Sequence, residues 1–397
     1  MGIKAIVNAK IVTCFCGVID KGILLWDDNN GKIIYCGNEA GIIPEQAQIL
    51  NMDGCVITPG FIDAHTHIGI QESITETAGD DLSETNLGHA TPFINASDSI
   101  NFNDVAFNDA ISGGVTTVGI LTGSGLAISG TGCIVKTAGP ILSRFISRQS
   151  CLKGALGEIP KKESLKNLSC ASSRGGNISV IRDCFYNAMF YSESKKMAFR
   201  NKSPFLKRPG YEVVCNVLEG NMPFRIHAFR SDDILSAIEL SDEFGINIII
   251  EHGLEAVELC DELSKRKIPV CFGTALSWRY SNETKNTGYS SVSVLLKKGV
   301  KTALITDHGC TPIEHLLLLS QLAIKEGVSW EDGIKLITLY PAQILGIENE
   351  VGSLRKGNDA DFNVFSGDPF HYTTKLKSVY INGNEVWNIE RNKKRWY

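Results

Sequence analysis

The chain has 397 residues, which is enough for a barrel with one small accessory domain. Its formal net charge of -5 comes without a basic block or stripe, which argues against nucleic acid or an anionic membrane surface as a partner. The N-terminus lacks an apolar core followed by a small-residue cleavage site, and the aliphatic run Leu316–Leu319 is too short to span a bilayer, so we expect a cytoplasmic protein.

Both ends of the chain carry short β-strand patterns separated by turn residues. The dipeptide Asn382-Gly383 predicts a tight hairpin near the C-terminus. Because a different pattern fills the middle, the two ends are expected to meet in one small β-domain, formed by residues 1–57 and 352–397. Its strands are predicted around residues 6–13, 22–26, 32–36, 361–365 and 379–387.

The middle of the chain, residues 58–351, alternates apolar strands with helical segments. The segment 231–244, for example, begins with a Ser-x-Asp cap region and has apolar residues spaced three and four apart. Such alternation is typical of parallel βα units, and over this length it predicts a (β/α)8 barrel of the α/β class. The strands are expected at 114–121, 246–251 and 301–306, and the helices at 104–112, 231–244 and 313–325.

Several of the predicted barrel strands end in titratable residues, and the carboxyl ends of parallel barrel strands form the catalytic rim. His65 and His67 stand at positions i and i+2 of one strand, so both side chains are expected to face the barrel interior. Imidazole and carboxylate ligands suit zinc and, less selectively, manganese, iron or nickel. The candidates at strand ends are His65, His67, Glu158, His227, His252, Asp307 and His308.

Each of these residues also has a simpler interpretation. A single histidine at a strand end is usually a hydrogen-bonded core or rim residue, so the metal hypothesis rests on the joint pattern. Asp307 belongs to a residue type that also caps helices. His308 remains open between a substrate contact and a structural role at the start of the next helix.

Beyond these residues, the chain resembles the amidohydrolase superfamily of metal-dependent hydrolases, in particular its imidazolonepropionase-like branch. The resemblance is carried by PGFIDAHTHIG, GGVTTV, RIHAFRSDDI, IIIEHG, TDHG and the closing VGSLRKGNDADFNVFSGDPF. It implies a distorted (β/α)8 barrel, a β-sandwich domain from the two ends, and one or two metal ions, usually zinc. It further implies that His65 and His67 ligate the first ion, that His227 and His252 serve a second ion or the substrate carbonyl, and that Asp307 ligates and takes a proton.

Two departures from the family pattern concern the same site. Many members with two ions bridge them with a carboxylated lysine at the end of strand four, where the matching strand here is predicted as 152–158. Glu158 is therefore predicted as the bridging carboxylate, with Lys136 as the second choice. The expected His-Ala-His-Arg motif has Phe229 in place of its second histidine, so any role of that histidine is lost.

These features predict hydrolysis of a C–N bond, in an amide or cyclic amide of a small molecule, by metal-activated hydroxide. Asp307 would accept the proton of the water, and His252 or a second ion would stabilise the oxyanion. Arg174 and Arg230 are candidates for binding a substrate carboxylate, with surface ion pairs as the alternative. The rival functions are a deaminase acting on a heterocyclic amidine and a barrel scaffold without catalysis. A homo-oligomer is compatible with the sequence.

Overall fold

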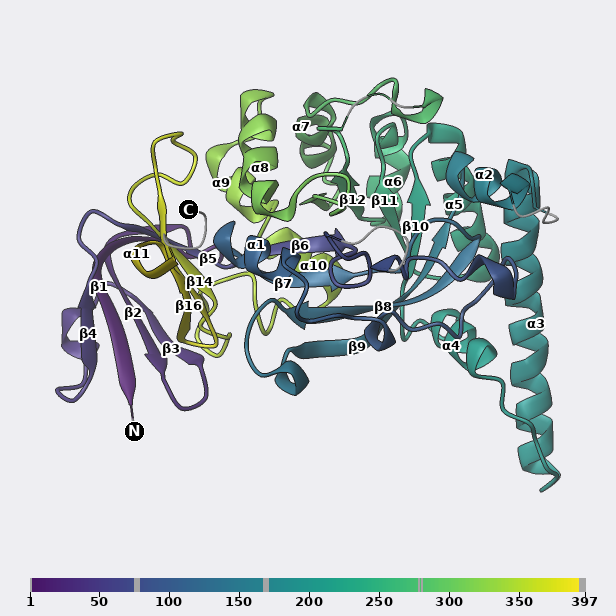
Figure 1. Ribbon diagram of the computed structural model, residues 1–397, viewed down its shortest axis with the longest axis horizontal. Helices are drawn as coiled ribbons and strands as arrows, with labels where there is room; N and C mark the ends of the chain where they lie inside the picture. The colour runs from purple at the N-terminus through teal and green to yellow at the C-terminus, as the bar shows by residue number, and fades with distance from the viewer. Residues whose placement is uncertain (1, 75–78, 167–170, 278, 280, 393–397) are drawn as a thin grey trace.

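The computed structural model describes the chain except residues 1, 75–78, 167–170, 278, 280 and 393–397. Its strands form two eight-stranded sheets, one built from the two ends of the chain and one from the middle (Figure 1). The prediction of an α/β protein with a separate sheet from both termini is therefore confirmed. The exact division at residues 57 and 352 stays a prediction.

The terminal sheet has the strand order β16-β15-β14-β5-β1-β2-β3, and β4 pairs with β1. β14 joins the two ends of the chain, because it pairs antiparallel with both β5 and β15. The rings of Trp26, Phe362 and Tyr380 pack together in the apolar interior of this sheet. Its strands are β1 (Ile3–Val12), β2 (Val18–Asp27), β3 (Lys32–Gly37), β4 (Gln48–Asn51), β5 (Val56–Pro59), β14 (Phe362–Phe365), β15 (Leu376–Ile381) and β16 (Asn384–Asn388).

The middle sheet runs in the order β6 to β13 and is a nearly closed, distorted barrel. The Asp307 N–H, just after β13, donates to the His65 carbonyl of β6 at 3.2 Å, which brings the two edges together. β8 runs antiparallel to β7 and β9, whereas the other neighbouring pairs are parallel. The strands are β6 (Phe61–Thr66), β7 (Val115–Ile120), β8 (Ile128–Lys136), β9 (Phe145–Ala155), β10 (Phe224–Ala228), β11 (Ile248–His252), β12 (Val270–Gly273) and β13 (Thr302–Ile305).

The helices α6 to α9 lie along one side of the barrel, and α3 lies at the end farthest from the terminal sheet (Figure 1). The helix predicted at 231–244 has these bounds in the structure, because its apolar residues Ile234, Ala237, Ile238 and Leu240 are buried. Within the described residues, no helix combines the length and the apolar character that crossing a bilayer requires. The helices are α1 (Ala106–Ser112), α2 (Glu158–Lys166), α3 (Arg174–Arg200), α4 (Pro209–Leu218), α5 (Ser231–Phe244), α6 (Cys260–Arg266), α7 (Ser290–Lys297), α8 (Leu316–Lys325), α9 (Trp330–Lys335), α10 (Leu339–Leu345) and α11 (Ile389–Asn392).

Lys136 is not at the catalytic rim, which corrects its place as the second choice for a bridging ligand. Because β8 is antiparallel, its last residue lies near the amino ends of its neighbours, on the side of the terminal sheet. There the buried Lys136 ammonium donates to Asp361 at 2.5 Å and to Asp359 at 2.8 Å. These two carboxylates raise the pKa of Lys136 although burial lowers it, so the lysine stays charged and joins the barrel to the terminal sheet.

We expect Lys136→Met to lower the free energy of unfolding by about 3–5 kcal/mol, because it leaves the buried Asp361 without its cation and Asp359 with Lys32 alone. A urea titration of the whole chain measures this loss. Lys32→Met is the matched control. Lys32 contacts Asp359 at 2.6 Å from a half-exposed position, so its loss should cost at most about 1 kcal/mol. Equal losses in the two variants would contradict the structural role of Lys136.

Candidate metal centre

Three predicted ligands meet at the carboxyl end of the barrel. His65 lies in β6, His67 follows its last residue, and Asp307 comes two residues after β13. The Nε2 atoms of His65 and His67 lie 3.3 and 3.2 Å from the same oxygen, Oδ1 of Asp307. All three residues are buried, and their ligand atoms lie within 4.8 Å of one another. The i, i+2 spacing therefore places both imidazoles on one face, as the sequence predicts.

The other ring nitrogen of each histidine is held by a fixed acceptor. His65 Nδ1 contacts Glu251 Oε2 at 2.6 Å, and the other oxygen of Glu251 accepts from Arg225 Nε at 2.6 Å. Burial alone would raise the pKa of Glu251, but Arg225 and His65 hold it well below its usual range. His67 Nδ1 contacts the carbonyl oxygen of Leu121 at 2.7 Å. Because both partners only accept, each Nδ1 carries the hydrogen and each Nε2 presents a lone pair.

When both rings are neutral, two lone pairs and a carboxylate oxygen therefore point at one another without a hydrogen between them. Burial lowers the pKa of His65, and its Nε2 is buried without a hydrogen-bond partner among the described residues. Burial alone would raise the pKa of Asp307, but the surrounding imidazoles hold it well below its usual range, so the carboxylate is ionised. Such an arrangement is unfavourable unless a cation lies between the donors. Two imidazoles and a carboxylate fit a divalent metal ion, and zinc in particular.

A second pair of imidazoles lies beside this group. The ring of His252 is 5.0 Å from that of His65 and 4.3 Å from that of His227, measured between centroids. Burial and neighbouring groups lower the pKa of His252 to about 3 and that of His227 well below its usual range, so both rings are neutral. His227 Nε2 and His252 Nδ1 are also buried without a hydrogen-bond partner in the described part of the chain. These atoms offer two further donors next to the first three.

The backbone at the rim is strained where the strands end. The φ angles of His252, Thr274 and Asp307 are 71°, 65° and 51°. They lie in the left-handed region, which residues other than glycine rarely occupy. These residues end β11, follow β12 and follow β13, respectively. Strain of this kind costs roughly 1–3 kcal/mol per residue and is found mainly at functional sites, where it directs a side chain. At His252 and Asp307, the strained residues are themselves candidate metal ligands.

Lys153 also lies at this site, and the sequence reasoning missed it. Its fully buried side chain comes from β9, and its Nζ donates to Ser124 Oγ at 3.0 Å and to the Gly154 carbonyl at 3.1 Å. Ser124 Oγ is in turn 3.1 Å from His227 Nδ1. Burial lowers the pKa of Lys153 to about 8. The sequence feature that could have indicated Lys153 is a lysine among the buried last residues of β9, two positions before the strand ends.

Glu158 lies in a different place from the one predicted for it. β9 ends at Ala155, so the strand expected over 152–158 stops earlier, and Glu158 is the first residue of α2. Its carboxylate faces Lys162 of the same helix at 3.2 Å. It is not one of the three residues whose ligand atoms converge, whereas Lys153 shares Ser124 with a predicted ligand. Of the two residues, Lys153 is therefore the one that lies in β9 and beside the candidate ligands.

The two arginines predicted to bind substrate are both held by carboxylates of the chain itself. Arg174, the first residue of α3, donates to Asp233 at 3.0 Å and to Glu283 at 2.6 Å. Arg230 forms a two-pronged contact with Asp232 at 2.9 and 2.7 Å near the surface. The ion pairs named as the alternative are thus present. A substrate role for either arginine stays a prediction.

His308 and Phe229 shape the cup beside the ligands. His308 Nδ1 accepts from the Ile313 N–H at 3.1 Å, so in the neutral ring its Nε2 carries the hydrogen and faces Ser73 Oγ at 3.2 Å. Phe229 is buried, with its ring 4.6 Å from the ring of His227 and 4.9 Å from that of His252. It fills the space beside both imidazoles with apolar surface and can neither ligate nor donate a proton.

Comparison with known proteins shows the family of the chain. The sequence profile of the amidohydrolase family matches residues 222–386. The crystal structure of an amidohydrolase from Thermotoga maritima is 36% identical, covers 97% of this chain and 100% of its own, and superposes with a TM-score of 0.93. An imidazolonepropionase of Sphingopyxis alaskensis is 24% identical over 91% of both chains. The amidohydrolase tasK of Hapsidospora irregularis is 22% identical over 92% of this chain, which spans 39% of the relative's length. The chain belongs to the amidohydrolase family.

Proposed function

We propose that the chain is a metal-dependent hydrolase that cleaves a C–N bond, in an amide or cyclic amide, of a small molecule. The observation that carries the proposal is the meeting of the His65 and His67 Nε2 lone pairs with Oδ1 of an ionised Asp307. The printed names of the relatives, an imidazolonepropionase and amidohydrolases, support the same reaction class.

Two groups of residues would hold the metal. His65, His67 and Asp307 would ligate the first ion, while His227 and His252 lie where they could ligate a second. This donor set favours zinc, and iron, manganese or nickel are the other metals it suits. When bound, such an ion polarises a carbonyl and lowers the pKa of water towards neutrality.

Lys153 replaces Glu158 in this proposal as the source of a bridging carboxylate. Carbon dioxide reacts with an uncharged amine: a bond forms from Nζ to the carbon, and Nζ gives up a proton. With a pKa of about 8, roughly a tenth of the Lys153 side chains are uncharged at pH 7. The resulting carboxylate would lie next to Ser124, whose Oγ is 3.0 Å from Nζ and 3.1 Å from His227 Nδ1.

The remaining residues of the cup have roles that follow from their protonation. Asp307 is ionised, so it can accept a proton from the attacking water and return it to the leaving nitrogen. His308 carries its hydrogen on Nε2 and can donate a hydrogen bond to a substrate oxygen. Phe229 gives one side of the cup an apolar surface, which favours substrates with an apolar group there.

Glu251→Gln should lower zinc affinity about 10- to 100-fold, because an amide no longer enforces the Nδ1–H form of His65. The affinity is measured on the folded protein by titration in a zinc-buffered solution. Glu255→Gln is the control, since Glu255 is also buried but accepts from Ser231 and Asn286 instead. Unchanged zinc affinity in Glu251→Gln would contradict the orienting role of Glu251.

Lys153→Ala should lower the metal content by about one ion per chain, whereas Glu158→Gln should leave it unchanged. The reason is that only Lys153 lies beside the donors of His227. Elemental analysis of both purified variants provides the measurement. A loss in Glu158→Gln and none in Lys153→Ala would restore the original assignment.

Asp307→Asn should reduce kcat about 10²- to 10⁴-fold on any substrate of the enzyme, because an amide cannot accept the proton. A panel of amides, cyclic amides and heterocyclic amidines, followed by carboxylate and ammonia detection, identifies the substrate class. Chelation should abolish turnover, and adding zinc, iron or manganese should restore it. Ammonia from amidines alone would make the enzyme a deaminase. A chain that holds no metal and stays inert after metal addition would refute the hydrolase.

A further inference from the structure

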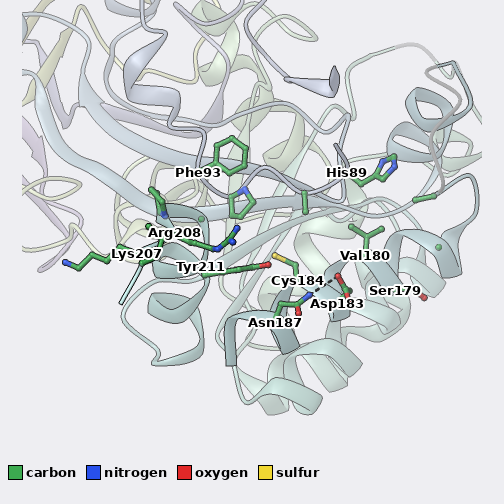
Figure 2. A pocket seen from close by; sticks show the side chains of 17 residues that line it. His89, Phe93, Ser179, Val180, Asp183, Cys184, Asn187, Lys207, Arg208 and Tyr211 are labelled. Atoms are coloured by element: carbon green, nitrogen blue, oxygen red, sulfur yellow. Dashed lines mark hydrogen bonds between the residues drawn. The ribbon is translucent and has the colours of Figure 1, made fainter. Parts of the chain in front are cut away.

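A second hollow lies on the outside of the barrel, apart from the metal centre. It has a volume of about 1030 Å³ and lies between α3, α4 and residues 89–93 (Figure 2). None of its described lining residues is one of the proposed metal ligands. Pockets for small molecules span roughly 300–1,000 Å³, so this hollow has the size of a ligand site.

The walls of this outer pocket are mainly apolar. Phe93 covers one side, while Val180 and Cys184 from α3 and Tyr211 from α4 form the other (Figure 2). At the edge of the pocket, Leu206 is 75% exposed. An open apolar surface of this kind marks a binding site more often than an unused part of the surface.

The shape of the pocket is fixed by contacts outside it. The Tyr191 hydroxyl of α3 accepts from the Arg208 N–H at 3.1 Å and donates to Glu212 at 2.6 Å. Lys195 neutralises the same carboxylate at 2.6 Å. At the other side, a Cβ on Gly210 would come within 3.0 Å of Pro92, so the first turn of α4 packs closely on the segment 89–93. The pocket is therefore formed before any ligand arrives.

Two cations, Arg208 and Lys207, line this pocket, and neither forms an ion pair within the described part of the chain. The Arg208 guanidinium points from one end into the space between the two walls (Figure 2). Within the described part of the chain, no carboxylate lies in ion-pair distance of it, whereas the nearby Lys195 is paired with Glu212. The pocket's own acid, Asp183, accepts from Asn187 at 3.0 Å on the opposite wall. An apolar trough with an unpaired guanidinium at its end is complementary to an apolar molecule with an anionic head.

We propose that the outer pocket binds a small amphipathic anion, with Arg208 holding its carboxylate or phosphate and the apolar walls covering its body. A guanidinium matches either head group through paired N–H donors. The apolar body would lie between Phe93 and Tyr211 and extend towards Val180. This site goes beyond the proposed hydrolysis, because it needs neither the metal ligands nor their chemistry.

The test is calorimetric titration of the full chain with dodecanoate, dodecyl phosphate and dodecan-1-ol. We expect saturable binding of at least one anion below about 1 mM, and the better anion identifies the head group. Arg208→Gln should weaken binding of that anion about tenfold or more while leaving dodecan-1-ol unchanged. Arg200→Gln is the control, because Arg200 is the last residue of α3 and does not line the pocket.

Val180→Trp fills the outer pocket and should abolish binding of both the anion and the alcohol. The metal content and the unfolding transition should stay as in the parent chain. Anion binding that is equally weakened by Arg208→Gln and Arg200→Gln would overturn the proposal. It would also fail if no ligand of the three binds saturably, or if sedimentation shows that a second copy of the chain covers Leu206 and Phe93.

Discussion

The site depends on one buried chain of charges, in which Arg225 holds Glu251 and Glu251 holds His65. All three side chains are buried, and each comes from a different barrel strand, β10, β11 and β6. Neither charge would be tolerated alone in this interior, but as a pair they keep the Nδ1 hydrogen of His65 in place. The orientation of the His65 Nε2 lone pair towards Asp307 is thus set by Arg225 and Glu251, which are not among the candidate ligands. The barrel interior and the candidate metal centre are one electrostatic unit.

The reversed strand β8 decides what two lysines do. Lys136 ends β8, and because that strand is antiparallel it lies at the barrel end facing the terminal sheet, between Asp359 and Asp361. Lys153 lies in β9, which runs parallel to β10, and so it comes to the opposite end beside Ser124. Carboxylates keep the first lysine charged, and burial without an ion pair lowers the pKa of the second. Strand direction therefore places Lys136 at the terminal sheet and Lys153 at the opposite end of the barrel, beside the candidate metal centre.

The sequence predicts the features that depend on local spacing. The pair His65 and His67 could be placed on one face because a strand alternates, and the helix 231–244 could be bounded because its apolar spacing is regular. The sequence could not predict where β9 ends, because none of the residues from Ala155 to Glu158 is incompatible with a strand. A difference of a few residues moves the proposed bridging position from Glu158 to Lys153. The ion pairs of Arg174 join residues far apart in sequence, which only the assembled barrel brings together.

α3 connects the rim with the outer pocket. Its first residue, Arg174, is tied to Asp233 and Glu283 at the barrel, and the turns from Gly176 to Asn187 form one wall of the pocket. The backbone hydrogen bonds of one continuous helix connect the two places. A ligand against Val180 would therefore act on the same rigid element that carries Arg174. The two arginines therefore differ in their role. The Arg174 guanidinium is held by Asp233 and Glu283 and fixes the start of α3, whereas the Arg208 guanidinium, just before α4, is free for the anion proposed in the outer pocket.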